Sequence, residues 1–100
     1  MTREAIINAF DEHLKKSNKQ YYNQFYIGIT NDIETRLFSA HKVPRENHWW
    51  IYRFADTEQI ARDVEKYYLD LGMQGDTGGG TGDGNVTCVY CYAIANYTVE

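Results

Sequence analysis

The sequence is poor in residues that stiffen or cross-link a chain, and it lacks long apolar runs. One proline and two cysteines occur among its 100 residues. No stretch approaches the roughly 20 consecutive apolar residues that a membrane-spanning helix needs. The residues after Met-Thr-Arg-Glu also lack the apolar core of a secretion signal. We therefore expect a cytoplasmic protein without a membrane partner.

The two cysteines form the single motif Cys88-Val-Tyr-Cys91. A CxxC motif without a second ligand pair does not indicate a zinc site. The motif lies in a predicted strand, where residues three apart point to opposite faces. This geometry argues against a shared metal or a disulfide, so we interpret both cysteines as packing residues.

The chain has no large excess of positive charge. Fourteen acidic and ten basic residues give a net charge of −4, which argues against a broad basic surface that coats DNA. Ten lysines and arginines can still form a local basic site. Hydrophobic residues make up 43% of the chain, which suits one domain, 1–100, with its own core.

Apolar spacing and breaker residues divide the chain into alternating helices and strands. The expected helices cover 2–17 (within an N-terminal segment 1–18), 32–41 and 57–71, and the expected strands cover 21–30, 48–54 and 86–97. A glycine-rich loop at 72–85 connects the last helix to the last strand. The order predicts an α+β fold, with a small, mainly antiparallel three-stranded sheet flanked by three helices.

The expected helix ends have recognisable capping residues. Thr2 and either Asp56 or Thr57 suit the N-caps of the first and third helices, and Gly72 suits the end of the third. Asn31, with Glu34 three residues later, suggests a capping box for the second helix. That helix is expected to bury Ile33, Leu37 and Ala40.

A set of residues between about 25 and 70 resembles the GIY-YIG nuclease family. Tyr26-Ile27-Gly28 matches the "YIG" element, and Arg36 follows Tyr26 by ten residues, as in that family. His41 lies five residues after Arg36, where the family usually places such a group four residues on. The pair Ala61 and Glu65 matches the spacing of the family's metal-binding helix.

The "GIY" strand that precedes "YIG" in the family has no counterpart at residues 14–18. We expect the last strand, with residues 88–94, to replace it and to pair with the Tyr26 strand, as a circular permutation would produce. Tyr90 best fits the missing tyrosine and Tyr92 is the next candidate. Asn85 is the nearest match to a late asparagine of the family.

The resemblance implies chemistry at a phosphodiester bond. Glu65 would hold one Mg²⁺ or Mn²⁺ ion, Tyr26 and Tyr90 would position or activate water, and Arg36 would stabilise the phosphate. His41 joins this catalytic set, although five residues of α-helix rotate it about 140° away from Arg36. Further expected substrate-binding residues are Gly28, Lys42, Tyr92 and Asn85.

The strand pleat places Tyr26, Gly28 and Thr30 on one face, and Gly28 is expected to leave that face open to a phosphate. It could instead mark a bulge. Arg36 could simply pair with Asp32 or Glu34. Glu65 could be an ordinary exposed helix residue.

Two functions therefore stay open. The first is a metal-dependent endonuclease that hydrolyses DNA phosphodiester bonds. The second is a degenerate relative that binds nucleic acid or a protein partner, or associates with itself, without cleavage.

Overall fold

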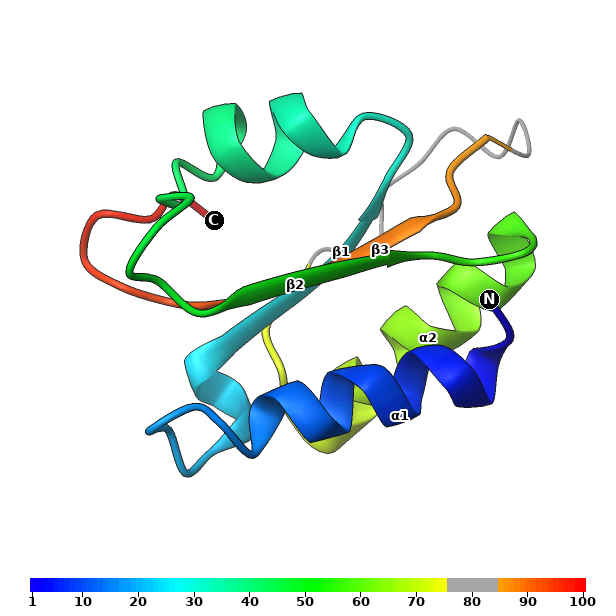
Figure 1. Ribbon diagram of the computed structural model, residues 1–100, viewed down its shortest axis with the longest axis horizontal. Coiled ribbons are helices and arrows are strands. Elements are labelled where there is room, and N and C mark those ends of the chain that lie inside the picture. The colour runs from blue at the N-terminus through cyan, green and yellow to red at the C-terminus, as the bar shows by residue number, and fades with distance from the viewer. Residues whose placement is uncertain (76–84) are drawn as a thin grey trace.

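The computed structural model describes residues 1–75 and 85–100, and its elements follow the expected order (Figure 1). The expected glycine-rich loop falls largely outside the described residues. Helices and strands together confirm the α+β class with a small antiparallel sheet. The elements are α1 (Arg3–Leu14), the 3₁₀ turn η1 (Tyr22–Gln24), β1 (Phe25–Thr30), the π-helix η2 (Glu34–Ala40), β2 (Trp50–Phe54), α2 (Glu58–Leu71) and β3 (Cys88–Ala93).

The last strand lies in the middle of the sheet. The strand order is β1-β3-β2, and β3 is antiparallel to both neighbours. Gly28 lies opposite Tyr90, and Tyr26 lies opposite Tyr92. The expected pairing of the last strand with the Tyr26 strand is therefore confirmed.

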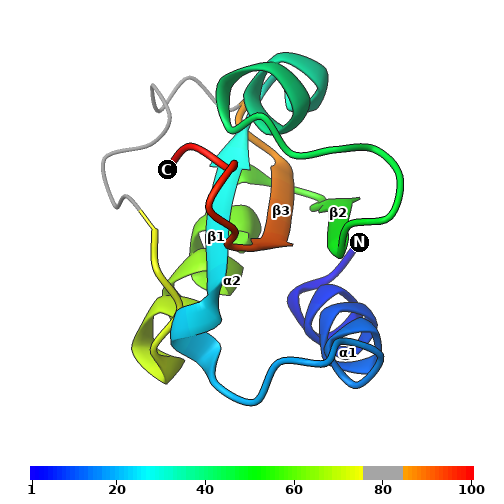
Figure 2. The same cartoon turned by 90° about the vertical axis from the view of Figure 1, so that its left-hand side faces the viewer.

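Two layers of helix enclose the sheet: α1 and α2 cover one face and η2 covers the other (Figures 1 and 2). The alternation of side chains along each strand separates two cores. The larger core lies against α1 and α2 and includes Ile6, Phe10, Ile27, Val64 and Tyr68. The smaller core lies on the η2 side and consists of Tyr26, Leu37, Val43, Tyr90 and Tyr92.

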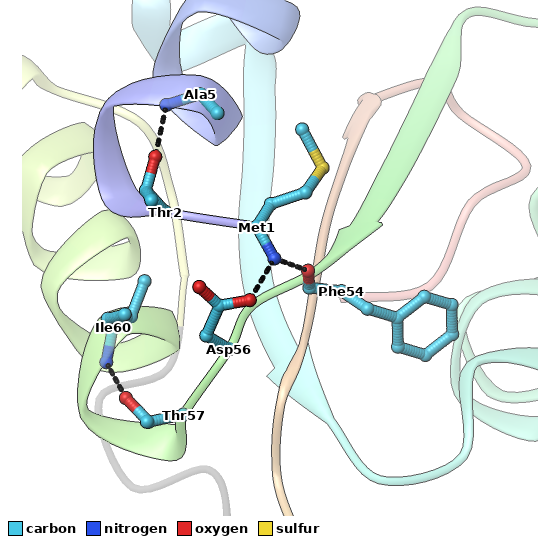
Figure 3. A network of polar contacts seen from close by, with 7 residues as sticks. All are labelled: Met1, Thr2, Ala5, Phe54, Asp56, Thr57 and Ile60. Carbon is cyan, nitrogen blue, oxygen red and sulfur yellow. Dashed lines mark hydrogen bonds and ion pairs between the residues drawn. The ribbon is translucent and has the colours of Figure 1, made fainter.

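Side-chain caps fix the starts of the two long helices, as Figure 3 shows. Thr2 Oγ1 accepts a hydrogen bond from Ala5 N (3.2 Å), and Thr57 Oγ1 accepts one from Ile60 N (3.1 Å). Gly72, with a φ of 116°, follows α2. These three residues were expected to delimit their helices from the sequence.

The start and packing of η2 differ from the expectation. Asp32 Oδ1, and not Asn31, accepts from the backbone at this helix start, where Thr35 N donates at 3.2 Å. Ala40, expected in the core, is exposed, whereas Leu37 is fully buried. The helical spacing used for the expectation does not apply, because η2 has π geometry.

Both outer edges of the sheet have partners among the described residues. Along β1, Gln74 exchanges backbone hydrogen bonds with Phe25 O (3.0 Å) and Ile27 N (2.9 Å).

No helix in the described part of the chain is long and apolar enough to cross a membrane.

Candidate functional site

The π-helix η2 places Arg36 and His41 on the same side of one turn. His41 N–H donates to Arg36 O at 3.0 Å, which is the i→i+5 bond of a π-helix. Residues five apart therefore stack along the helix. The expected rotation of about 140° between them was wrong, because it assumed 3.6 residues per turn.

Tyr90 lies at the centre of the site, between these two side chains. Its hydroxyl is 2.8 Å from His41 Nε2 and 3.4 Å from Arg36 Nε. His41 Nδ1 lies 2.6 Å from Val99 O, and a carbonyl oxygen only accepts. We therefore assign the proton of the neutral ring to Nδ1, so Tyr90 O–H donates to Nε2 and Arg36 Nε–H donates to the Tyr90 oxygen.

Tyr26 and Tyr92 complete an aromatic cluster around His41. The Tyr26 ring is 4.7 Å from the His41 ring and 5.3 Å from the Tyr92 ring, centroid to centroid. The Tyr92 hydroxyl is 3.0 Å from His41 Nδ1. Both candidates for the missing tyrosine thus touch His41, and Tyr90 additionally contacts Arg36.

The space beside Gly28 is filled by the Tyr90 ring. A Cβ atom at position 28 would lie 2.8 Å from Tyr90 Cε1 and closer still to the end of that ring. The expectation that Gly28 opens this face to a phosphate was therefore wrong. The glycine makes room for the tyrosine on the neighbouring strand, and it lies in regular strand pairing, not at a bulge.

Glu65 is a buried residue of α2. Its side chain is 5% exposed, so the alternative of an ordinary exposed helix glutamate was wrong. Burial is the largest cause that raises the pKa of Tyr90, and the negative charge of Glu65 adds the smallest contribution to that shift. The described residues contain no group of three or more histidines, cysteines or acids placed to hold a metal ion.

The remaining expected residues lie at the margin. Lys42 is exposed and ends η2 with a φ of 58°. Asn85 is exposed where the description of the chain resumes. Glu34, offered as one partner of Arg36, forms an ion pair with Arg45. Cys88 and Cys91 are free thiols buried in the protein, in agreement with packing roles.

Burial keeps Tyr90, Tyr92 and His41 uncharged at neutral pH. The side chains of Tyr26, Tyr90, Tyr92 and His41 are each 4% exposed or less. Burial raises the pKa of Tyr90 and Tyr92 well above the ordinary tyrosine value, although the Arg36 hydrogen bond opposes this at Tyr90. Burial likewise lowers the pKa of His41. His41 is thus a neutral proton acceptor beside a phenol donor.

The segment after β3 contacts the cluster from the solvent side, a feature that no sequence motif indicates. Val99 N donates to His41 O at 2.8 Å, and Val99 O accepts from His41 Nδ1. Tyr26 also lines a surface pocket with Met73, Gln74, Gly75 and Glu100. Access to the cluster from solvent is therefore bordered by residues 73–75 and by Glu100.

Comparisons with models of known protein families, with curated proteins and with solved structures find no match to this chain.

Proposed function

We propose that this domain is a metal-dependent endonuclease-like domain that hydrolyses DNA phosphodiester bonds, with chemistry that resembles the GIY-YIG family. The observation that carries the proposal is the position of the Tyr90 hydroxyl between His41 Nε2 and Arg36 Nε. A phenol between a neutral base and a guanidinium can lose its proton to the base while the guanidinium stabilises the developing charge.

The side chains divide the work of hydrolysis by their chemistry. Arg36 stays charged at all relevant pH values, is exposed, and can bind two phosphate oxygens through its planar fork. Tyr90 would accept the proton of the attacking water as its own proton passes to His41 Nε2. Tyr26, packed against the His41 ring, would hold that ring in place.

Glu65 would hold the divalent ion that the resemblance implies. A carboxylate is the hard oxygen ligand that Mg²⁺ and Mn²⁺ prefer, and Mg²⁺ typically keeps several waters and takes one or two carboxylates. Glu65 is buried on α2, and its negative charge raises the pKa of Tyr90, so a carboxylate lies within electrostatic range of that hydroxyl. When bound, the ion would offset negative charge on the scissile phosphate.

A second function, binding without cleavage, is favoured by one observation. The Tyr90 and Tyr92 side chains are 1% and 0% exposed, so the arrangement seen here does not admit a phosphate to either hydroxyl. A degenerate relative that keeps the fold and a surface for nucleic acid or protein would have the same buried cluster.

Arg36→Ala separates the two functions. For a nuclease, loss of the phosphate-binding fork should lower the cleavage rate by about 10² or more, as for other groups that stabilise transition-state charge. The midpoint of thermal unfolding should change little, because an exposed arginine contributes less than about 1 kcal/mol. Arg62→Ala, which removes an arginine paired with Glu58 on α2, is the matched control and should cleave like the wild type.

Cleavage is measured on plasmid and oligonucleotide DNA with Mg²⁺ or Mn²⁺, with Glu65→Gln as a second variant. Glu65→Gln keeps the side-chain shape and should abolish metal-dependent cleavage. No cleavage by any form, with weaker DNA binding by Arg36→Ala, would support the degenerate function. Equal cleavage and equal binding by all forms would reject a role for Arg36 at the site.

A further inference from the structure

Four aromatic side chains lie along the edge strand β2 and on η2, and we call them the aromatic row: Phe38, Trp50, Tyr52 and Phe54. Trp50, Tyr52 and Phe54 alternate along β2 and therefore share one sheet face. The Trp50 and Tyr52 rings are stacked at 5.8 Å with an angle of 7° between their planes. Phe38 of η2 packs edge-on against Trp50 at 5.1 Å. Phe54 ends the row and is 54% exposed.

The aromatic row is continuous with the tyrosine cluster. Trp50 lies directly opposite Tyr92, and Tyr52 lies directly opposite Tyr90. Side chains opposite each other on antiparallel strands are nearest neighbours on the same face. Because the Tyr90 ring extends over Gly28 on β1, a chain lying on the aromatic row would pass one strand away from the hydroxyl that Arg36 and His41 contact.

The charges around the aromatic row suit an anionic chain. The three strands contain no aspartate or glutamate, and their one charged residue, Arg53, alternates with Tyr52 and Phe54 and therefore lies on the opposite face of the sheet. The Arg45 guanidinium lies over the Phe38 ring at 4.0 Å. Arg36 contacts Tyr90, which lies opposite Tyr52 on the neighbouring strand. Glu34, the partner of Arg45, is the acid that would compete with a phosphate there.

The outer edge of β2 is not available for pairing with another strand. The outward carbonyls of Trp50, Tyr52 and Phe54 accept, respectively, from His13 Nε2 (3.0 Å), Arg53 (2.7 Å) and the Met1 amine (2.9 Å; Figure 3). Strand addition by a peptide or by a second copy would require these bonds to break. The face of the row, and not its edge, is the surface open to a ligand.

We propose that the aromatic row binds an unpaired strand of nucleic acid, with bases stacked on Phe54 and Tyr52 and the phosphate chain running toward Arg36. This inference rests on the proposed function and specifies its substrate as DNA with a single-stranded segment. Stacking on aromatic side chains needs bases that are free of a duplex and tolerates any sequence. A duplex does not present its base faces to the row.

The test is binding of a fluorescently labelled oligothymidine and of a blunt duplex of equal length, measured by anisotropy in Ca²⁺ to prevent cleavage. Phe54→Ala should weaken binding of the single strand by about 5-fold or more, since one stacked base contributes at least about 1 kcal/mol. Duplex binding should not change. Tyr21→Ala, which removes an aromatic side chain that is 66% exposed elsewhere, is the matched control and should bind like the wild type.

The outcomes distinguish this inference from the proposed function. Single-strand binding that depends on Phe54, in a protein that never cleaves DNA, would keep the aromatic row and reject the nuclease. If cleavage depends on Arg36 but neither Phe54→Ala nor Tyr52→Ala changes single-strand binding, the aromatic row is rejected as the binding surface. Loss of self-association by Phe54→Ala in sedimentation, without an effect on single-strand binding, would show a protein contact and overturn the proposal.

Discussion

At the scale of single residues, the site depends on a glycine that makes room for a tyrosine ring on the neighbouring strand. Gly28 and Tyr90 are directly opposite, and the missing side chain of one admits the ring of the other. That ring then reaches His41 and Arg36 with its hydroxyl. The glycine thus acts on the site through the tyrosine.

Gly28→Ala should displace the Tyr90 ring and destabilise the domain by about 1–3 kcal/mol, the usual cost of an overpacked core. Urea unfolding measures this cost. In a Tyr90→Ala background the same substitution should cost much less, because the ring that it would strike is gone. If Gly28→Ala lowered the free energy of unfolding equally in both backgrounds, the Tyr90 ring would not be what fills the space beside Gly28.

At the scale of elements, η2 determines which side chains meet. Its π geometry allows a spacing of five residues to bring His41 above Arg36, where an α-helix would need four. The element ends with Lys42 in a left-handed conformation, and Val43 N donates back to Leu37 O at 3.2 Å. This ending places Val43 in the smaller core, together with the tyrosines of the site.

Removing Ser39, which is exposed in η2, should convert this turn to α-helix. The histidine would then follow Arg36 by four residues and would still lie one turn above it. We expect the deletion to preserve the contact between Tyr90 and this histidine, visible by NMR as a slowly exchanging hydroxyl proton of Tyr90. Insertion of one alanine after Ser39 is the control and should remove that signal. Loss of the signal in the deletion variant would contradict this account of the helix.

The strands and the caps were predictable because local residues determine them, whereas the pairing of β1 with β3 was predicted from the family resemblance and its missing first strand. Thr2, Thr57 and Gly72 mark helix ends through their own hydrogen bonds or backbone freedom. The alternation in β1 also predicted that Tyr26, Gly28 and Thr30 share one face of the sheet. The π geometry of η2 was not predictable, because the spacing of Ile33, Leu37 and Ala40 fits an α-helix.

The non-local contacts in the site could not be predicted from the sequence, because they depend on how distant segments of the chain pack together. The filling of the Gly28 space depends on the register between β1 and β3. The contact of Val99 with His41 joins residues 58 positions apart and has no motif. The burial of Glu65 depends on how α2 lies against the rest of the fold.

At the scale of the whole molecule, two histidines join separate parts of the fold in their neutral form. His41 joins η2 to β3 and to the segment that contains Val99. His13 Nε2 joins α1 to the Trp50 carbonyl of β2. Burial is the largest cause that lowers the pKa of each, and a backbone hydrogen bond opposes it in each case.

These lowered pKa values predict acid sensitivity. Both histidines have an ordinary value of 6.5 in the unfolded chain, and the folded values are lower. Below pH 6.5 the unfolded state therefore binds protons that the folded state does not, so the free energy of unfolding falls as the pH decreases. Above pH 6.5, the contribution of the two neutral histidines to the stability of the folded state is fully present.

Urea unfolding between about pH 5.5 and 7.5 tests this, because most carboxylates stay ionised over that range. We expect stability to decrease toward the acidic end in the wild type. His41→Gln should lower stability at pH 7.5 but flatten its dependence on pH. Ile7→Val, which destabilises the core without removing a titratable group, should keep the wild-type slope. A slope that His41→Gln leaves unchanged would mean that His41 is not held neutral by the cluster of Tyr90 and Tyr92.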